Sequence, residues 1–442
     1  MIAATTAPRS PLDGSPYQAY SYSYPHKTSY GPLDPPASLR DLWVDERRGS
    51  LFLYIHVPFC GMRCGFCNLF TRAGADEATI TRYLDALRRE AETVRETLGE
   101  AAFARFAIGG GTPTYLDLSG LAALFDVADR IMGLDLAAVP TSVEVSPGTV
   151  DAEKLALLTG HGVDRISIGV ESFDESEAAA VYRPQASAEV HRALRAIREA
   201  GPRTLNIDLI YGLPGQTVES WLRSLDEALR YEPEELYLYP LYVRPLTGLG
   251  RSGRSWDDLR LTCYREARDR LLDLGYEQAS MRMFRRPGTA ETGPLYCCQD
   301  DGMVGLGCGA RSYTRALHYS TEYAVGARGV RALIDAYSAR EAGSFAVAGY
   351  GRRLDGEEQR RRFVIQSILP CSGLSMADYA RRFRSEATDD LPELLALEEL
   401  GLAERRGDVL ALNARGIERS DAIGPWLYSE AVRRAMEAYE WR

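Results

Sequence analysis

The sequence predicts an α/β fold: a partial (βα)6, TIM-like barrel with an irregular N-terminal arm before it and a C-terminal helical, winged-helix-like domain after it. Six strand-like segments alternate with helix-like segments, and each strand segment is apolar almost throughout. This pattern is typical of a parallel sheet covered by helices. No phosphate-binding glycine fingerprint follows the first strand, which favours an incomplete barrel over a dinucleotide-binding fold.

The composition divides the chain into four parts. Residues 1–48 are rich in Pro, Ser and Tyr and lack helix or strand periodicity, so we expect an irregular arm. Residues 49–315 carry the strand–helix alternation, 316–354 form a connecting helical segment, and 355–442 form the C-terminal domain. The tyrosine-rich stretch of the arm, residues 20–33, either packs on the outside of the barrel or closes over an active site.

The six strand–helix units follow one another along the chain. Apolar runs predict the strands, and apolar residues three and four apart predict the helices. The predicted pairs are strand 51–57 with helix 77–98, FARFAIG with a helix from about 118, TSVEVS with about 151–160, RISIGV with about 187–200, LNIDLIYG with about 217–230, and ELYLYP with about 256–274.

The C-terminal domain follows a different pattern. Charged helical stretches, a helix ended by glycine in LPELLALEELG, and the short strand segment VLALN indicate a small winged-helix unit. Winged helices often bind DNA, but this one belongs to an acidic chain. We therefore expect a structural or substrate-covering domain.

Charge and composition exclude several classes of protein. The chain of 442 residues is 45% hydrophobic and carries a net charge of −10, which argues against a nucleic-acid-binding surface. No apolar run is long enough to span a bilayer, and the N-terminus lacks the apolar core of a secretory signal. Eight cysteines in a chain of this length do not indicate a disulfide scaffold. We expect a monomer in the reducing cytoplasm.

Three cysteines, Cys60, Cys64 and Cys67, lie in the segment HVPFCGMRCGFCNLF, just after the first predicted strand. In a βα barrel this loop is at the rim where active sites are built. A zinc site would need a fourth ligand, for which His56 is the nearby candidate. A 4Fe–4S cluster held by three thiolates would instead leave one iron open to a substrate or cofactor.

The CxxxCxxC spacing in an aromatic-rich loop resembles the radical S-adenosylmethionine (SAM) superfamily. The resemblance implies that the amino and carboxylate groups of SAM bind the open iron. It also implies that the reduced cluster cleaves SAM to methionine and a 5′-deoxyadenosyl radical, which abstracts hydrogen from a small organic substrate. A reducing partner such as flavodoxin or ferredoxin would supply the electron.

Polar or glycine-rich residues follow the later strands as well. GGGTPT (109–114) follows the second strand, and glycines let a backbone approach a ligand closely. Glu144, Glu171 and Asp208 lie at the ends of the next three strands, where they could accept hydrogen bonds from a ribose or an amino group. Each alone could be an ordinary carboxylate. Together they indicate a binding site at one rim of the barrel.

The segments YIHVPFC, GGGTPT, VSPGT, DRISIGVESF and NIDLIYGLPGQT together resemble the oxygen-independent coproporphyrinogen III dehydrogenase family, with its heme chaperones and radical methyltransferases. The resemblance covers roughly residues 50–315. It implies that the three cysteines hold the cluster and that Tyr54, Gly110 and Glu144 contact its SAM, with Tyr54 also close to the chemistry. It further implies a second SAM, contacted by Phe66, Gly111, Thr112, Glu171, Arg183, Asp208 and Pro240. The family usually has glutamine at the position of Glu171.

The segment LYCCQDDGMVGLGCGARS (295–312) departs further from the family. Its GLGCGA run resembles a family segment that lines the SAM pocket, so Arg311 stands where the relatives place an apolar contact to the first SAM. Cys297 and Cys298 replace residues expected to face the substrate. They are either small buried residues or thiols that give a hydrogen atom to a substrate radical.

Three functions follow from the resemblance. The first is hydrogen abstraction from an organic substrate, as in coproporphyrinogen oxidation. The second is radical methyl transfer that uses the second SAM as the carbon source. The third is a heme-binding chaperone, although the five histidines of the chain form no obvious heme motif.

Overall fold

The computed structural model describes residues 10–21, 23–289 and 298–441. The chain forms two compact units. The larger unit contains Gly31–Cys263 and Gly288–Gly351, and the smaller one contains Tyr264–Pro287, Arg352–Glu440 and the described part of residues 1–30. No helix among the described residues combines the length and the apolar character that crossing a membrane requires.

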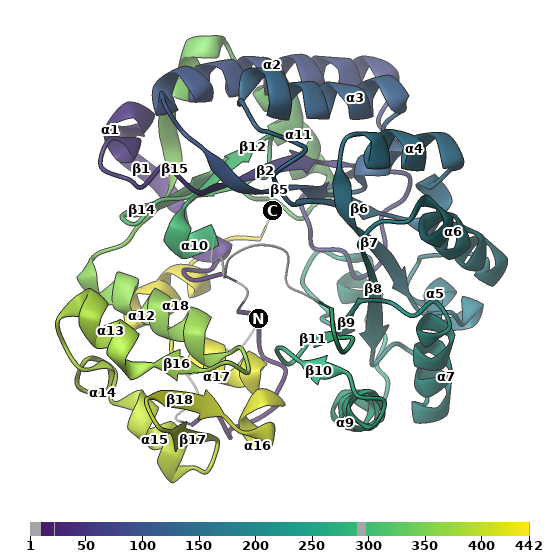
Figure 1. The fold of residues 1–442 in the computed structure, drawn as a ribbon, viewed down its shortest axis with the longest axis vertical. Coiled ribbons are helices and arrows are strands. Elements are labelled where there is room, and N and C mark those ends of the chain that lie inside the picture. The colour runs from purple at the N-terminus through teal and green to yellow at the C-terminus, as the bar shows by residue number, and fades with distance from the viewer. Residues whose placement is uncertain (1–9, 22, 290–297, 442) are drawn as a thin grey trace. The chain divides into compact units, whose positions relative to one another are not determined.

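The larger unit is built on a sheet whose six central strands are parallel and lie in chain order. They are β2 (Leu51–Val57), β5 (Phe103–Gly110), β6 (Thr141–Val145), β7 (Val163–Glu171), β8 (Thr204–Tyr211) and β9 (Glu235–Pro240). The helices that follow them are α2 (Glu77–Leu98), α3 (Leu118–Asp126), α4 (Ala152–Gly160), α5 (Glu175–Ala180) with α6 (Ser187–Ala200), α7 (Val218–Leu229) and α9 (Arg260–Asp273). The predicted strand–helix alternation and the open, barrel-like sheet are confirmed (Figure 1).

The sheet continues beyond β2 with elements from both ends of the unit. Strand β12 (Met303–Leu306) pairs parallel with β2, and the order then runs through β13 (Arg311–Tyr313), β14 (Leu317–Ser320), β15 (Val347–Arg353) and β1 (Gly31–Ser38). The remaining elements of this unit are α1 (Leu39–Trp43), β3 (Phe59–Cys60), β4 (Arg72–Ala73), α8 (Gly248–Ser252), α10 (Cys298–Asp301) and α11 (Ala327–Ser338).

These elements differ from the predicted organisation in two places. Residues 31–48 were expected to belong to an irregular arm but form β1 and α1, because β1 finds a partner in β15. The segment 316–354 was expected to be helical and contains α11, but it also supplies β14 and β15. Both strands depend on pairing with distant residues, which short-range periodicity does not report.

The parallel strands carry different side chains on their two faces. Leu53 pairs in register with Phe106, and Val143 pairs with Ile166, and these four buried side chains lie on one face of the sheet. Alternate positions carry polar groups instead: Tyr54, Ser142, Glu144, Arg165, Ser167, Asn206, Asp208, Glu235 and Tyr237. The strands are therefore less uniformly apolar than predicted, and their polar inner face is available for a site.

The smaller unit contains a three-stranded sheet and a set of helices. The strand order is β16 (Leu374–Ser375), β18 (Val409–Leu412) and β17 (Ala403–Arg406). The other elements are β10 (Glu277–Gln278), β11 (Met283–Arg285), α12 (Gly356–Ile368), α13 (Met376–Phe383), α14 (Ala387–Asp390), α15 (Glu393–Glu399), α16 (Ala414–Ile417), α17 (Ser420–Trp426) and α18 (Glu430–Glu437). The β17–β18 hairpin after α15 contains the strand segment predicted for the winged-helix unit.

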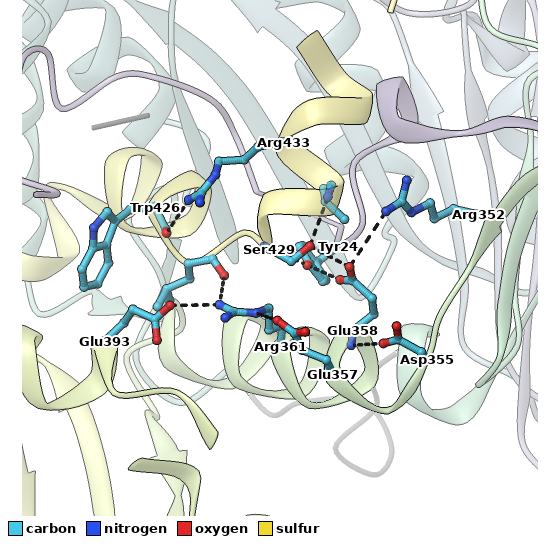
Figure 2. Close-up of polar contacts among 12 residues, drawn as sticks. Tyr24, Arg352, Asp355, Glu357, Glu358, Arg361, Glu393, Trp426, Ser429 and Arg433 are labelled. Atoms are coloured by element: carbon cyan, nitrogen blue, oxygen red, sulfur yellow. Dashed lines mark hydrogen bonds and ion pairs between the residues drawn. The ribbon is translucent and has the colours of Figure 1, made fainter. Parts of the chain in front are cut away.

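The described part of the N-terminal arm packs on this smaller unit. Buried Glu358 of α12 accepts a hydrogen bond from the Tyr24 hydroxyl and another from Ser429 Oγ at 2.6 Å (Figure 2). Ser429 N in turn donates to the Tyr24 hydroxyl at 3.2 Å. Burial, with the adjacent Glu358 charge, raises the pKa of Tyr24. The arm therefore belongs to the core of the C-terminal unit.

We predict that Glu358→Ala lowers the free energy of unfolding of the smaller unit by about 1–3 kcal/mol, because buried hydroxyls of Tyr24 and Ser429 lose their acceptor. Urea unfolding measures the change. The matched control is Glu357→Ala on the same helix, whose side chain is 63% exposed and pairs with Arg361. Its effect on the free energy of unfolding should be about 0.5 kcal/mol. Equal effects of the two substitutions would contradict the assignment.

Candidate functional site

The three predicted cysteines lie close together after strand β2. Cys60, Cys64 and Cys67 are free and partly buried, and Cys60 ends the short strand β3. Burial, and next the charge of Cys67, raises the pKa of the Cys60 thiol to about 12. The charges of Cys64 and Cys67 likewise act on each other. The loop therefore gathers three thiols whose ionised forms need a compensating positive charge.

Each thiol has a polar neighbour. Thr112 Oγ1 donates to Cys60 Sγ at 3.7 Å, and Arg183 Nη1 donates to Cys64 Sγ at 3.3 Å. The Cys67 Sγ and Thr71 Oγ1 atoms are 3.7 Å apart. A guanidinium beside a sulfur favours the thiolate, which is the metal-binding form. Two residues predicted at the site, Thr112 and Arg183, therefore contact the cysteines directly.

Among the described residues, no group of three or more His, Cys, Asp and Glu side chains converges tightly enough to hold a single metal ion. His56, the candidate fourth zinc ligand, has its ring nitrogens near other partners: Nε2 lies 3.0 Å from Phe70 O and Nδ1 3.2 Å from the Tyr54 hydroxyl. A cubane cluster needs a wider arrangement, because each thiolate binds a different iron. The donor set of three thiols without a converging fourth group fits the cluster better than zinc.

The glycine run after β5 brings bare backbone against this loop. A Cβ on Gly111 would lie 2.5 Å from Phe59 O and 2.9 Å from Cys60 Sγ. A Cβ on Gly110 would lie 2.6 Å from the His56 ring, and its φ of 117° is open to glycine only. A side chain at Gly111 would displace the cysteine loop, and one at Gly110 would displace the His56 ring.

Glu144 connects the glycine run to the polar inner face. Its Oε2 accepts a hydrogen bond from Gly110 N at 3.0 Å. The surrounding protein raises the pKa of Glu144 to about 7 by desolvation. Because the side chain is also solvent-accessible, water weakens this effect. A carboxylate anchored on one oxygen and open to solvent is suited to accept a hydrogen bond from a ligand.

Two further carboxylates share this face. Burial raises the pKa of Glu171 to about 7 and that of Asp208 to about 6. Asp208 Oδ1 accepts from Asn206 Nδ2 at 2.7 Å, and Glu171 Oε1 lies 3.9 Å from Arg183 Nη1. The structure thus brings three of the predicted carboxylates to one polar face, with Arg183 between Glu171 and the cysteine loop.

Glu171 has an unusual backbone conformation. It is a non-glycine residue with φ of 66°, and it lies at a register shift between β7 and β8. This left-handed conformation is unfavourable for a side-chain-bearing residue and is found mainly where the surroundings enforce it. Here it accompanies the approach of the carboxylate to Arg183.

The other predicted residues are more dispersed. Phe66 packs against the buried cluster formed by Val181, Ile210, Leu213, Leu241 and Leu249. Pro240 ends β9 and is buried. The Arg311 guanidinium carbon lies 5.8 Å from the centre of the Tyr313 ring.

The two thiols predicted near the substrate are only partly placed. Cys298 begins α10 and is partly buried. Cys297 lies outside the described residues. The proposed hydrogen-donor role of both stays a prediction.

Sequence analysis did not identify Glu90 on α2. Its Oε2 accepts hydrogen bonds from Gly307 N and from the Tyr337 hydroxyl, both at 2.7 Å. Gly307 begins the turn of the GLGCGA run, and a Cβ on Gly309 in that turn would lie 3.1 Å from His56 Nε2. Glu90 therefore fixes a loop that lies next to the site. Its position on a helix, far from any motif, gave no signal of this role.

Comparison with known proteins gives consistent matches. Residues 54–228 match the radical SAM superfamily. The chain is 28% identical to an oxygen-independent coproporphyrinogen III oxidase of Pseudomonas aeruginosa, over 92% of this chain and 90% of that protein. It is 31% identical to the heme chaperone HemW of Escherichia coli, over 59% and 69% respectively. The crystal structure of Escherichia coli coproporphyrinogen III oxidase has the same fold, with a TM-score of 0.77 at 24% identity, covering 92% of this chain and 96% of that one.

We predict a pH-dependent gain in stability for Glu171→Gln in SAM-free protein. Glu171 holds its proton up to about pH 7 in the folded state, against an ordinary value of 4.5. The stability it contributes is therefore present at low pH and lost as the pH rises through that interval. Glutamine cannot ionise, so the stability of the variant relative to the wild type should increase by about 1–3 kcal/mol between pH 5 and pH 8.

Urea unfolding at the two pH values measures this change. The exposed Glu153→Gln is the matched control, and its effect should be the same at both. If the relative stability of Glu171→Gln does not depend on pH, Glu171 is not held protonated by its surroundings.

Proposed function

Since the chain belongs to the radical SAM superfamily, within the group that contains the oxygen-independent coproporphyrinogen III oxidases and the HemW heme chaperones, we propose that it is an oxidase of the coproporphyrinogen type. Proteins of this superfamily use SAM at a 4Fe–4S cluster, which supplies a radical able to abstract hydrogen from an organic substrate. The observation that carries the proposal is the convergence of Cys60, Cys64 and Cys67 beside the glycine run and the polar inner face.

The residues of the loop fit such a cluster. Cys60, Cys64 and Cys67 supply thiolates, and the Arg183 guanidinium and the Thr112 hydroxyl donate hydrogen bonds to two of the sulfurs. Hydrogen bonds and positive charge near cluster sulfurs stabilise the added negative charge of reduction. Burial of Cys60 also limits the contact of water with its sulfur.

The inner face then orients SAM. Gly110 and Glu144 are joined by a hydrogen bond. The second carboxylate oxygen of Glu144 would accept a hydrogen bond from the ammonium group of SAM, and Tyr54 would contact the same molecule. A second SAM would contact Phe66, Gly111, Thr112, Glu171, Arg183, Asp208 and Pro240. Glu171 adds a negative charge where the relatives have a neutral amide, which favours a cationic sulfonium. Arg311 completes the first SAM pocket from the GLGCGA side.

The extent of the similarity favours the oxidase over the chaperone. The match to the Pseudomonas oxidase extends over 92% of this chain, whereas the match to the Escherichia coli HemW covers 59%. The oxidase match therefore also includes much of the C-terminal unit. The substrate is a small organic molecule. The protein acts as a cytoplasmic monomer without nucleic acid, and receives its electron from a flavodoxin or ferredoxin.

We predict that replacing Cys60, Cys64 and Cys67 together by alanine abolishes cluster binding. After anaerobic reconstitution, iron and sulfide analysis and the EPR signal of the reduced protein should fall to background, because no thiolate ligand remains at the loop. The control is Cys371→Ala, which removes a free cysteine of the smaller unit and should leave the signal intact. A persisting cluster in the triple variant would overturn the ligand assignment.

The test of the function is anaerobic turnover of the reconstituted protein with SAM, a reductant and coproporphyrinogen III. We predict release of 5′-deoxyadenosine and a product that has lost CO2 and two hydrogen atoms per converted propionate, detected by mass spectrometry. A product heavier by a methyl group would instead identify a methyltransferase. Tight heme binding with no product would identify a chaperone.

The same assay separates SAM cleavage from substrate chemistry. Cys297→Ala and Cys298→Ala should retain the cluster and 5′-deoxyadenosine release, while one of them loses or diverts the product. Unchanged product in both variants would leave the two cysteines with a packing role only.

A further inference from the structure

A cavity lies on the face of the sheet opposite to the proposed SAM site. It has a volume of about 370 Å³ and is lined by residues of α2, α11 and the strands β12 to β15. Val304 in its wall pairs in register with Leu53, on the helix-covered face, whereas Tyr54 and Glu144 belong to the opposite face. The volume is within the range of small-molecule pockets.

One end of this cavity carries a carboxylate with an open oxygen. The Glu90 side chain accepts hydrogen bonds from Gly307 N and from the Tyr337 hydroxyl, and both go to Oε2. Oε1 receives no hydrogen bond from the residues that the structure describes and is not sealed from solvent. Desolvation raises the pKa of Glu90 above its ordinary value. A partner that donates a hydrogen bond or carries positive charge would relieve this desolvation.

The same cavity contains a guanidinium with an open nitrogen. Arg340 donates through Nε and Nη2 to Ser344, and its guanidinium carbon lies 4.2 Å from the centre of the Phe345 ring. Nη1 makes no hydrogen bond to another residue of the described ranges. The positive charge of Arg340 acts on Glu90, yet the two side chains form no ion pair within 4.0 Å. Their charges are therefore held apart, with room between them.

Apolar side chains surround these two charges. Val94, Val304 and Leu333 line the wall, and the first two are almost fully buried. A ligand with one net charge would satisfy one of the two groups and be repelled by the other. A zwitterion with an apolar body matches both charges and the wall at once.

We propose that this cavity binds a free α-amino acid with an apolar side chain. Its ammonium group donates to Glu90 Oε1, its carboxylate accepts from Arg340 Nη1, and its side chain packs against Val94, Val304 and Leu333. The proposed ligand takes no part in SAM cleavage. Gly305, Gly307 and Ala310 of the GLGCGA run also line the cavity, and Glu90 accepts a hydrogen bond from Gly307 N.

The test is isothermal titration of the anaerobic holoprotein with L-leucine, 3-methylbutylamine and 4-methylpentanoate. The amine lacks the carboxylate and the acid lacks the ammonium group, so both should bind at least tenfold more weakly than L-leucine. Arg340→Met and Glu90→Gln should each weaken L-leucine binding at least tenfold. The matched control, Arg331→Met, removes an exposed arginine of α11 and should not change it.

Four results would overturn the proposal: no saturable binding of L-leucine by the wild type, equal binding of the amine or the acid, unchanged affinity in Arg340→Met, or displacement of L-leucine by SAM. The Arg340 variant decides the outcome if Glu90→Gln disturbs the fold, because the side-chain hydrogen bonds of Arg340 go to exposed Ser344. Saturating SAM fills the cluster site, so L-leucine binding at this cavity should be unchanged in its presence. Displacement by SAM would assign the heat to the cluster site instead.

Discussion

The larger unit depends on the strict alternation of side chains along its parallel strands. Positions that pair with Leu53 and Ile108 carry apolar side chains beneath the helices, and this face supplies the buried apolar area that stabilises the unit. The other face does not have to supply this buried apolar area. It can hold Glu144, Arg165 and Asp208, which would be unfavourable in an ordinary core.

This division also explains the electrostatics of the inner face. Arg165 pairs with Glu235 at 2.8 Å, while Glu144, Glu171 and Asp208 have raised pKa values because protein surrounds them. Glu171 and Asp208 can bind a cationic ligand at little additional desolvation, since much of their hydration is lost on folding, whereas Glu144 remains open to solvent. A sulfonium or ammonium group would complete the charge balance that the fold leaves open.

Much of the fold was readable from the sequence because its signals are local. Strand 51–57 and helix 77–98 were predicted with the observed bounds, since their apolar spacing is continuous. The place of Glu144 near the rim was expected from a general rule on strand ends, but its hydrogen bond from Gly110 N was not predicted. The Tyr24–Glu358 contact joins residues 334 positions apart. Glu90 contacts a loop that is distant in the sequence, and Glu171 has a strained backbone conformation. No period or motif records such pairings.

The smaller unit is assembled from three separate stretches of the chain, the arm, residues 264–287 and residues 352–440. On the ribosome, most of the larger unit emerges before the last of these stretches, and domains tend to fold as they appear. Tyr24 must then wait for Glu358 and Ser429 to be synthesised before its hydroxyl finds its native partners. A premature stop codon shortly before residue 358 would therefore release the N-terminal arm as well as remove the C-terminal helices, and both ends of the polypeptide would be exposed to proteases together.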